Sequence, residues 1–199
     1  MVDHQGRTKA RHHELLNGLW LAGVRHYPVI NDAPEIRVTD QGMAESYYKD
    51  SFLRFQVEMI RRFKPSVIVG HDVNGEYHST LHIYNTKNLM KAVEVAADPA
   101  HDPESAERYG VWDTPKTYLH LYGPEDERTV LDYETPLAAF GGKTAFEVAQ
   151  EAYALHISQQ KLHFRVYGFD SGFDSHSFGL YRSLVGPDAE RNDLMENIT

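Results

Sequence analysis

The chain has 199 residues, and its 20 basic and 29 acidic side chains give a formal net charge of −9. Hydrophobic residues make up 41% of the chain and charged residues 25%, which is typical of a packed globular domain and excludes disordered, collagen-like and coiled-coil proteins. This length predicts one domain over residues 1–199 that buries a sizeable core.

Composition also limits the partners and the chemistry. The acidic balance and the dispersed basic residues argue against a nucleic-acid partner. No stretch approaches the roughly 20 apolar residues of a membrane span, and the polar first residues lack a signal peptide, so the cytoplasm is the default location. The chain has no cysteine, which excludes disulfides, thiolate zinc sites and a cysteine nucleophile. Any metal must be bound by His, Asp or Glu, and the chain has 12 histidines.

The first part of the chain predicts two helices and a strand. Leucines and a tryptophan over residues 15–20 favour a short amphipathic helix, and a strand is expected near residues 24–30. Aromatic and apolar residues recur every three or four positions over residues 44–63, which predicts a helix that Pro65 ends.

The next segment predicts a strand, a loop and a helix. Residues 67–69 are a β-branched run, which predicts a central parallel strand buried on both faces. A helix is expected over residues 79–97, with Ser79 or Thr80 as its cap. This order is the unit of a doubly wound sheet, whose ligands bind beyond the carboxyl ends of the strands. The expected binding segment is therefore residues 71–82.

The second half of the chain is less regular. A strand is expected over residues 116–122, irregular structure over 123–142 and a helix over 144–159. Residues 164–199 are rich in Gly, Asp and Ser, and we expect long ordered loops there.

Residues 71–82 contain the densest group of potential metal ligands. If a helix begins near His78, this residue and His82 lie on one helical face at a spacing that can chelate zinc. Asp72 or Glu76 would supply a carboxylate ligand or a general base. A solvated polar loop followed by a helix cap explains the same residues equally well, so both interpretations stay open.

The same residues carry a family resemblance. The run VIVGHDVNGEYHSTLH, preceded by IRRFKP and followed by TPLAAFGGKTAFEVAQEAYALHISQQ and FGLYRSLVGPDAERNDLMENI, resembles the C-terminal two-thirds of the PIG-L (LmbE-like) zinc-dependent N-deacetylases. The resemblance implies an α/β, Rossmann-like sandwich with a mostly parallel sheet and a loop-rich C-terminal tail. It also implies zinc-assisted hydrolysis of an N-acetyl group on an N-acetylglucosamine-type sugar or conjugate.

The resemblance also implies roles for individual residues. It places His82 on the family's zinc-binding histidine. Ser79 stands where the family has a second histidine that stabilises the oxyanion, so His78, one residue earlier, is the candidate to replace it. Asp72 is the other catalytic candidate. The substrate-binding candidates are His71, Asn74, Glu76 and His156, although a lone histidine on an apolar helix face, such as His156, is more often a hydrogen-bonded core residue.

The family's His-Pro-Asp-Asp-Glu motif is absent from the 199 residues. Two of the three zinc ligands and the general base that the resemblance implies are therefore missing. We expect an N-terminally truncated domain without its first strand, and a homo-oligomer that covers the exposed sheet edge is one hypothesis. The alternatives are a non-catalytic remnant or carbohydrate-binding module of the same fold, or a longer native protein.

Overall fold

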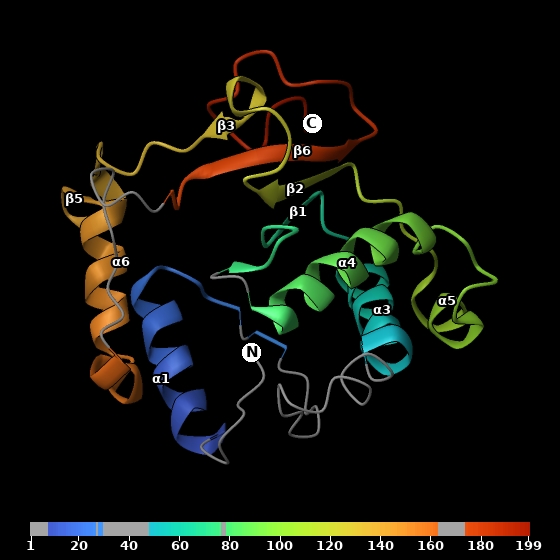
Figure 1. The fold of residues 1–199 in the computed structure, drawn as a ribbon, viewed down its shortest axis with the longest axis horizontal. Helices are drawn as coiled ribbons and strands as arrows, with labels where there is room; N and C mark the ends of the chain where they lie inside the picture. The colour runs from blue at the N-terminus through green and yellow to red at the C-terminus, as the bar shows by residue number, and fades with distance from the viewer. Residues whose placement is uncertain (1–7, 27, 30–47, 77–78, 163–173) are drawn as a thin grey trace. The chain divides into compact units, whose positions relative to one another are not determined.

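The computed structural model describes residues 8–26, 28–29, 48–76, 79–162 and 174–199 (Figure 1). They form two compact units. The first contains the described residues within 1–36 and 132–175, and the second those within 37–131 and 176–199. In the described ranges, no helix is long and apolar enough to cross a membrane.

The second unit contains a four-stranded sheet with the strand order β1-β2-β6-β3. The strands are β1 (Val67–Gly70), β2 (Lys116–His120), β6 (Ser177–Ser183) and β3 (Thr129–Val130). β1 pairs with β2 in parallel, whereas β6 pairs with β2 and β3 in antiparallel fashion. The α/β class is confirmed, but the described strands form a mixed sheet and not the expected mostly parallel one.

The position of β1 also differs from the expectation. Among the described strands β1 is at an edge of the sheet, and Val69 is 47% exposed. The prediction of a central strand buried on both faces was wrong, because a short β-branched run suits any strand with partial cover and does not report its place in the sheet. β2 is central and fully buried.

Two helices pack together beside this sheet. They are α3 (Leu53–Phe63), which continues a π-helical turn η1 (Tyr48–Phe52), and α4 (Thr80–Val95) (Figure 1). The expected helix over 44–63 is confirmed from residue 48 onward, and residues 44–47 lie outside the described residues. Ser79 occupies the N-cap position of α4, but its side chain makes no capping hydrogen bond. The core of the unit is apolar and comes mostly from α3 and α4: Val57, Ile60, Ala92, Val93 and Ala96.

A buried arginine connects α3 to the chain that follows α4. Arg61 is fully buried, and its guanidinium donates to the carbonyl oxygens of Ala96, Asp98 and Asp102 at 2.7–3.0 Å. It also donates to the hydroxyl of Ser105 in α5 (Pro103–Tyr109) at 2.7 Å. Burial lowers the pKa of Arg61, and the nearby carboxylates of Asp102 and Asp98 oppose that shift. The hydrogen bonds compensate for removing this cation from water.

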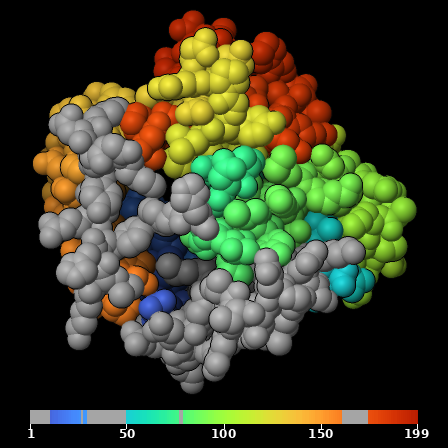
Figure 2. Space-filling model, viewed as in Figure 1, coloured from blue at the N-terminus to red at the C-terminus, as the bar shows by residue number. Residues whose placement is uncertain are grey.

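The C-terminal part of the chain is more regular than expected. Residues 177–183 form β6, so the prediction of loops over residues 164–199 was wrong there, and residues 163–173 lie outside the described residues. After β6 the C-terminal residues lie against residues 121–131, and Figure 2 shows the red C-terminal part of the chain beside the yellow segment. Arg191 donates to the carbonyl of Asp126, and its main-chain carbonyl accepts from the amide of Val130. The yellow segment includes the 3-10 turn η3 (Glu125–Glu127).

Asp188 anchors the end of the chain to β2. Its carboxylate accepts hydrogen bonds from Lys116 and from the hydroxyl of Tyr118, and the side chains of Lys116 and Asp188 are 0% and 4% exposed. Burial raises the pKa of Tyr118, and the hydrogen bond to Asp188 raises it further. A buried ammonium without a partner costs free energy, so Lys116 of β2 favours the conformation in which the C-terminal segment brings Asp188 to it.

The first unit consists mainly of α1 (Thr8–Leu21) and α6 (Ala145–Ala154), which lie side by side (Figure 1). Shorter elements are β4 (Pro136–Leu137), η4 (Ala138–Phe140), β5 (Lys143–Thr144) and η5 (Ile157–Leu162). The carboxylate of Glu14 ties α1 to η5 by accepting from the amide and the hydroxyl of Ser158 at 3.0 and 2.6 Å.

Two expectations for this unit have different outcomes. The helix over residues 144–159 is confirmed as α6, which Thr144 begins with a reciprocal capping box to Glu147, but it gives way to the 3-10 turn η5 before its expected end. The strand expected near residues 24–30 was wrong for the described positions 24–26 and 28–29, which form no strand.

Candidate functional site

The candidate site lies at the carboxyl ends of the parallel pair β1 and β2. Gly70, the last residue of β1, pairs with Leu119, so His71 follows β1 beside His120, the last residue of β2. The loop after β1 then leads into α4, which carries His82 in its first turn. Three histidines, from the loop after β1, from the end of β2 and from α4, therefore meet at the carboxyl ends of these two strands.

Glu76 connects these elements. Its carboxylate accepts a hydrogen bond from Nδ1 of His120, which lies 2.9 and 3.0 Å from the two oxygens. The amide of Asp72 donates to Oε1 at 3.0 Å, and Nδ1 of His71 lies 3.6 Å from the same oxygen. Burial alone would raise the pKa of Glu76, but the contacts with His120, His71 and the Asp72 amide outweigh it and hold that pKa well below its usual range. Glu76 is therefore an ionised carboxylate that accepts hydrogen bonds from two different segments, the loop after β1 and the end of β2.

His82 has a defined tautomer in this arrangement. Its Nδ1 lies 3.0 Å from the main-chain carbonyl oxygen of Glu76. A carbonyl only accepts hydrogen bonds, so Nδ1 carries a proton, and in the neutral ring Nε2 keeps its lone pair. Burial lowers the pKa of His82, and the neighbouring His71, whose ring stacks on it at 4.9 Å, lowers it further against the effect of Glu76. A neutral imidazole with Nε2 free of a proton is the form that binds metals.

The loop between β1 and α4 is fixed by its own hydrogen bonds. Oδ1 of Asp72 accepts from the amide of Asn74 at 2.8 Å and from its side-chain nitrogen at 3.2 Å, and Thr86 of α4 donates to the carbonyl of Asp72 at 3.2 Å. Gly75 has a φ of +77°, and a Cβ there would lie 2.4 Å from the carbonyl oxygen of Ser79. Only glycine satisfies both conditions without displacing the start of α4.

Three of the proposed site residues come together: His71, Glu76 and His82. Asp72 and Asn74 lie in the same loop, but the carboxylate of Asp72 holds the loop backbone. His78 lies outside the described residues. His156 is in the first unit, where its ring stacks on Tyr153 at 6.1 Å and its Nε2 lies 3.0 Å from where a Cβ on Gly18 would be.

Sequence reasoning missed His120. Its side chain is 6% exposed, and its ring packs against Phe178 of β6 with the centroids 5.4 Å apart. A signal was available, because His120 lies near the carboxyl end of the strand predicted over residues 116–122, and parallel strands end on the same side of a sheet. The strand was predicted to continue to residue 122, which placed this histidine inside it.

The expected zinc site is matched only in part. A structural or catalytic zinc ion takes at least three protein ligands. In the part of the chain that the structure describes, no group of three or more His, Asp or Glu side chains could hold a metal ion. His82 has the hydrogen bonding typical of a ligand, so the described residues fit part of a metal site and not a complete set.

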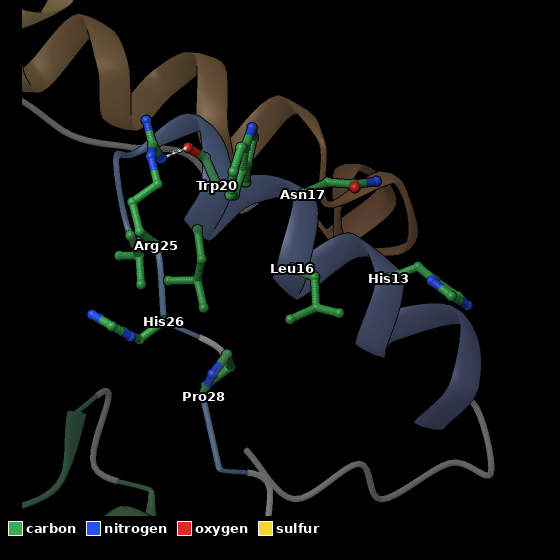
Figure 3. A pocket seen from close by; sticks show the side chains of 9 residues that line it. His13, Leu16, Asn17, Trp20, Arg25, His26 and Pro28 are labelled. Atoms are coloured by element: carbon green, nitrogen blue, oxygen red, sulfur yellow. Dashed lines mark hydrogen bonds between the residues drawn. The ribbon is translucent and has the colours of Figure 1, made fainter. Parts of the chain in front are cut away.

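A separate cavity of about 430 Å³ lies in the first unit, between α1 and the chain that follows it (Figure 3). Trp20 lines it and is 63% exposed, and the guanidinium of Arg25 lies 4.5 Å above the indole ring. Arg25 also donates to the carbonyl of Trp20 at 2.8 Å, as Figure 3 shows. None of the proposed site residues lines this cavity.

Known proteins share parts of this sequence. The chain is 42% identical over 62 residues to 1D-myo-inositol 2-acetamido-2-deoxy-alpha-D-glucopyranoside deacetylase 1 of Catenulispora acidiphila. The matched residues are 31% of this chain and 18% of the relative. Over 111 residues it is 35% identical to deacetylase 2 of that name from Saccharopolyspora erythraea, with 54% and 36% covered. The corresponding deacetylase of Geodermatophilus obscurus is 36% identical over 69 residues, with 35% and 22% covered.

These relatives are named as deacetylases of an acetamido sugar joined to inositol. The chain spans only 18% to 36% of their length. No protein-family model matches the chain.

Proposed function

We propose that this chain carries part of the site of a metal-dependent N-deacetylase with an LmbE-like, Rossmann-like fold. The substrate class is an N-acetylated sugar or conjugate of the N-acetylglucosamine type, in keeping with the names of the relatives. The observation that carries the proposal is the hydrogen bond from Nδ1 of His82 to the Glu76 carbonyl, which leaves Nε2 ready to bind a divalent metal such as zinc. The other ligands that the resemblance implies belong to the His-Pro-Asp-Asp-Glu motif, which the 199 residues lack.

The reaction is the hydrolysis of an acetamide. Water adds its oxygen to the carbonyl carbon, the C–N bond breaks, and the nitrogen takes a proton, which gives acetate and a free amine. A bound divalent metal would supply the Lewis acid for this chemistry. His71, whose side chain is 44% exposed and whose ring stacks on His82, would hydrogen-bond a substrate that enters beside His82. Glu76 holds both histidines, and Asp72, Asn74 and His78 remain candidates for contacts with the substrate.

The test uses the full chain with zinc and an acetamido sugar joined to inositol. Freed amine is measured with an amine-reactive dye, and bound zinc by elemental analysis. We expect His82→Ala to lose both the zinc and the amine release, whereas the exposed His12→Ala keeps both. Undiminished zinc in His82→Ala would refute the assignment.

The alternative is a non-catalytic module of the same fold that binds carbohydrate. The incomplete ligand set within the described residues favours it. A chain that binds the sugar conjugate in calorimetry but frees no amine with zinc present would support the alternative and contradict the deacetylase.

The proposed homo-oligomer is tested separately. It would cover the edge of the sheet where β1 lies. Light scattering at micromolar concentration should give a multiple of the chain mass, and a monomeric mass would contradict it.

A further inference from the structure

The contacts around Glu76 give that residue two tasks at once. Its carboxylate is bound to His120 at the end of β2, while its main-chain carbonyl accepts the proton on Nδ1 of His82 in α4. The two groups belong to one residue, so the place of the carbonyl depends on what holds the carboxylate.

His120 is suited to hold that carboxylate in place. It is buried at the end of the central strand β2, and its ring packs on Phe178 of the neighbouring strand β6. Its hydrogen bond to the ionised Glu76 is charge-assisted and lies out of water, where such bonds are stronger than neutral ones. The buried end of β2 thus gives the carboxylate of Glu76 a fixed partner outside its own loop.

We propose that Glu76 and His120 form a positioning pair that sets the tautomer and the orientation of His82. His120 holds the carboxylate of Glu76 in place, and this fixes the position of the main-chain carbonyl of the same residue. The carbonyl accepts a hydrogen bond from His82 and so keeps the proton of that ring on Nδ1. The value of this arrangement for metal binding rests on the proposed function of His82. The effect on the tautomer does not.

The first experiment uses the metal-free full chain labelled with ¹⁵N in its histidines. Two-bond ¹H–¹⁵N spectra report which ring nitrogen of His82 carries the proton, and the signals are assigned by their loss in His82→Gln. We expect wild type to carry the proton on Nδ1. His120→Leu should shift His82 toward the Nε2–H form, and His120→Asn, whose amide can donate from near the Nδ1 position, should restore Nδ1–H.

A control separates positioning from general destabilisation. Tyr118→Phe changes a buried residue of the same strand, removes its hydrogen bond to Asp188 and leaves Glu76 untouched. It should lower the urea midpoint but leave the tautomer of His82 unchanged. If His120→Leu does not fold, Glu76→Gln, which keeps the size of the side chain and removes its charge, gives the same readout. A proton that stays on Nδ1 in His120→Leu, or in Glu76→Gln where that variant is used, would overturn the proposal.

The second experiment measures zinc affinity by competition with a chelating dye. Loss of a residue that orients a ligand typically reduces metal affinity 10- to 100-fold, so His120→Leu should bind zinc more weakly by about that factor and His120→Asn by less. A changed tautomer in a chain whose zinc binding does not depend on His82 would refute the proposed function and keep the positioning pair. Zinc that depends on His82 but not on His120, together with a His82 tautomer that His120→Leu leaves unchanged, would refute the pair and keep the function.

Discussion

At the scale of single residues, two charged side chains each make several hydrogen bonds that connect different elements of the second unit. Glu76 joins the loop after β1 to β2 and α4, and Arg61 joins α3 to the chain between α4 and α5. Both are charged groups out of water, so each stabilises the fold only while its partners are present.

Replacing Arg61 tests this dependence. Arg61→Met removes the guanidinium from three carbonyls and from the Ser105 hydroxyl, and a hydrogen bond to a charged group typically contributes about 1.5–3 kcal/mol. We expect the free energy of unfolding in urea to fall by more than about 3 kcal/mol. Arg62→Met, at the exposed neighbouring position, should change it by about 0.5 kcal/mol or less. Equal effects at both positions would show that the buried hydrogen bonds are not the cause.

The sequence indicated part of the site and not its centre. His71, Glu76 and His82 were found together because they lie close in the chain after a strand. His120 was not, because it lies on a strand that is distant in the sequence, and that strand was predicted to continue two residues beyond it. The contact between Glu76 and His120 depends on the pairing of β1 with β2, and the residues of either strand alone do not reveal that pairing.

At the scale of elements, periodicity predicted the helices well, since α3, α4 and α6 each bury one face. The strand predicted over residues 116–122, after a turn-rich connection, is confirmed as β2, which ends two residues earlier at His120. β6 was missed because it contains Gly179 and two serines, which are typical of turns. Gly179 is nevertheless required, as a Cβ there would lie within 2 Å of the carbonyl oxygen of Tyr122.

The segment after β6 predicts a dependence of stability on pH. The amide of Ala189, and then those of Arg191 and Glu190, donate to the carboxylate of Glu196 and lower its pKa against a smaller opposing effect of burial. A carboxyl whose pKa is lower in the folded state stabilises that state above its usual pKa of about 4.3 and loses the effect as pH falls through the folded value.

Glu196→Gln measures that contribution. The urea midpoint of the variant should lie below that of wild type at pH 7, and the difference should shrink as the pH falls below about 4 because the wild-type carboxyl then becomes neutral. The exposed Glu107→Gln on α5 controls for the loss of one charge. A difference that stays constant with pH would show that the carboxylate charge is not involved.

At the scale of the whole molecule, the second unit is assembled from two separate parts of the chain. Residues 132–175 belong to the first unit and interrupt it. β6, which comes after this interruption, lies between β2 and β3 and brings the Asp188 partner of Lys116. The sheet is therefore incomplete without the last part of the chain.

A chain that ends at residue 175 tests this assembly. It lacks β6, so β2 and β3 lose their shared neighbour and Lys116 is left as a buried ammonium without its carboxylate. We expect no cooperative urea transition from the sheet unit and a collapse of the dispersed amide signals of β2. A cooperative transition close to that of the full chain would contradict the expectation.

The place of β6 also has a consequence for biosynthesis. While the ribosome is still adding residues 121–176, the newly made β2 has β1 beside it but not its other neighbour. One edge of the nascent sheet is exposed during that interval, when unpaired strands are prone to aggregate. Chaperones that shield emerging chains should therefore matter most for this protein between the synthesis of its second strand and its last.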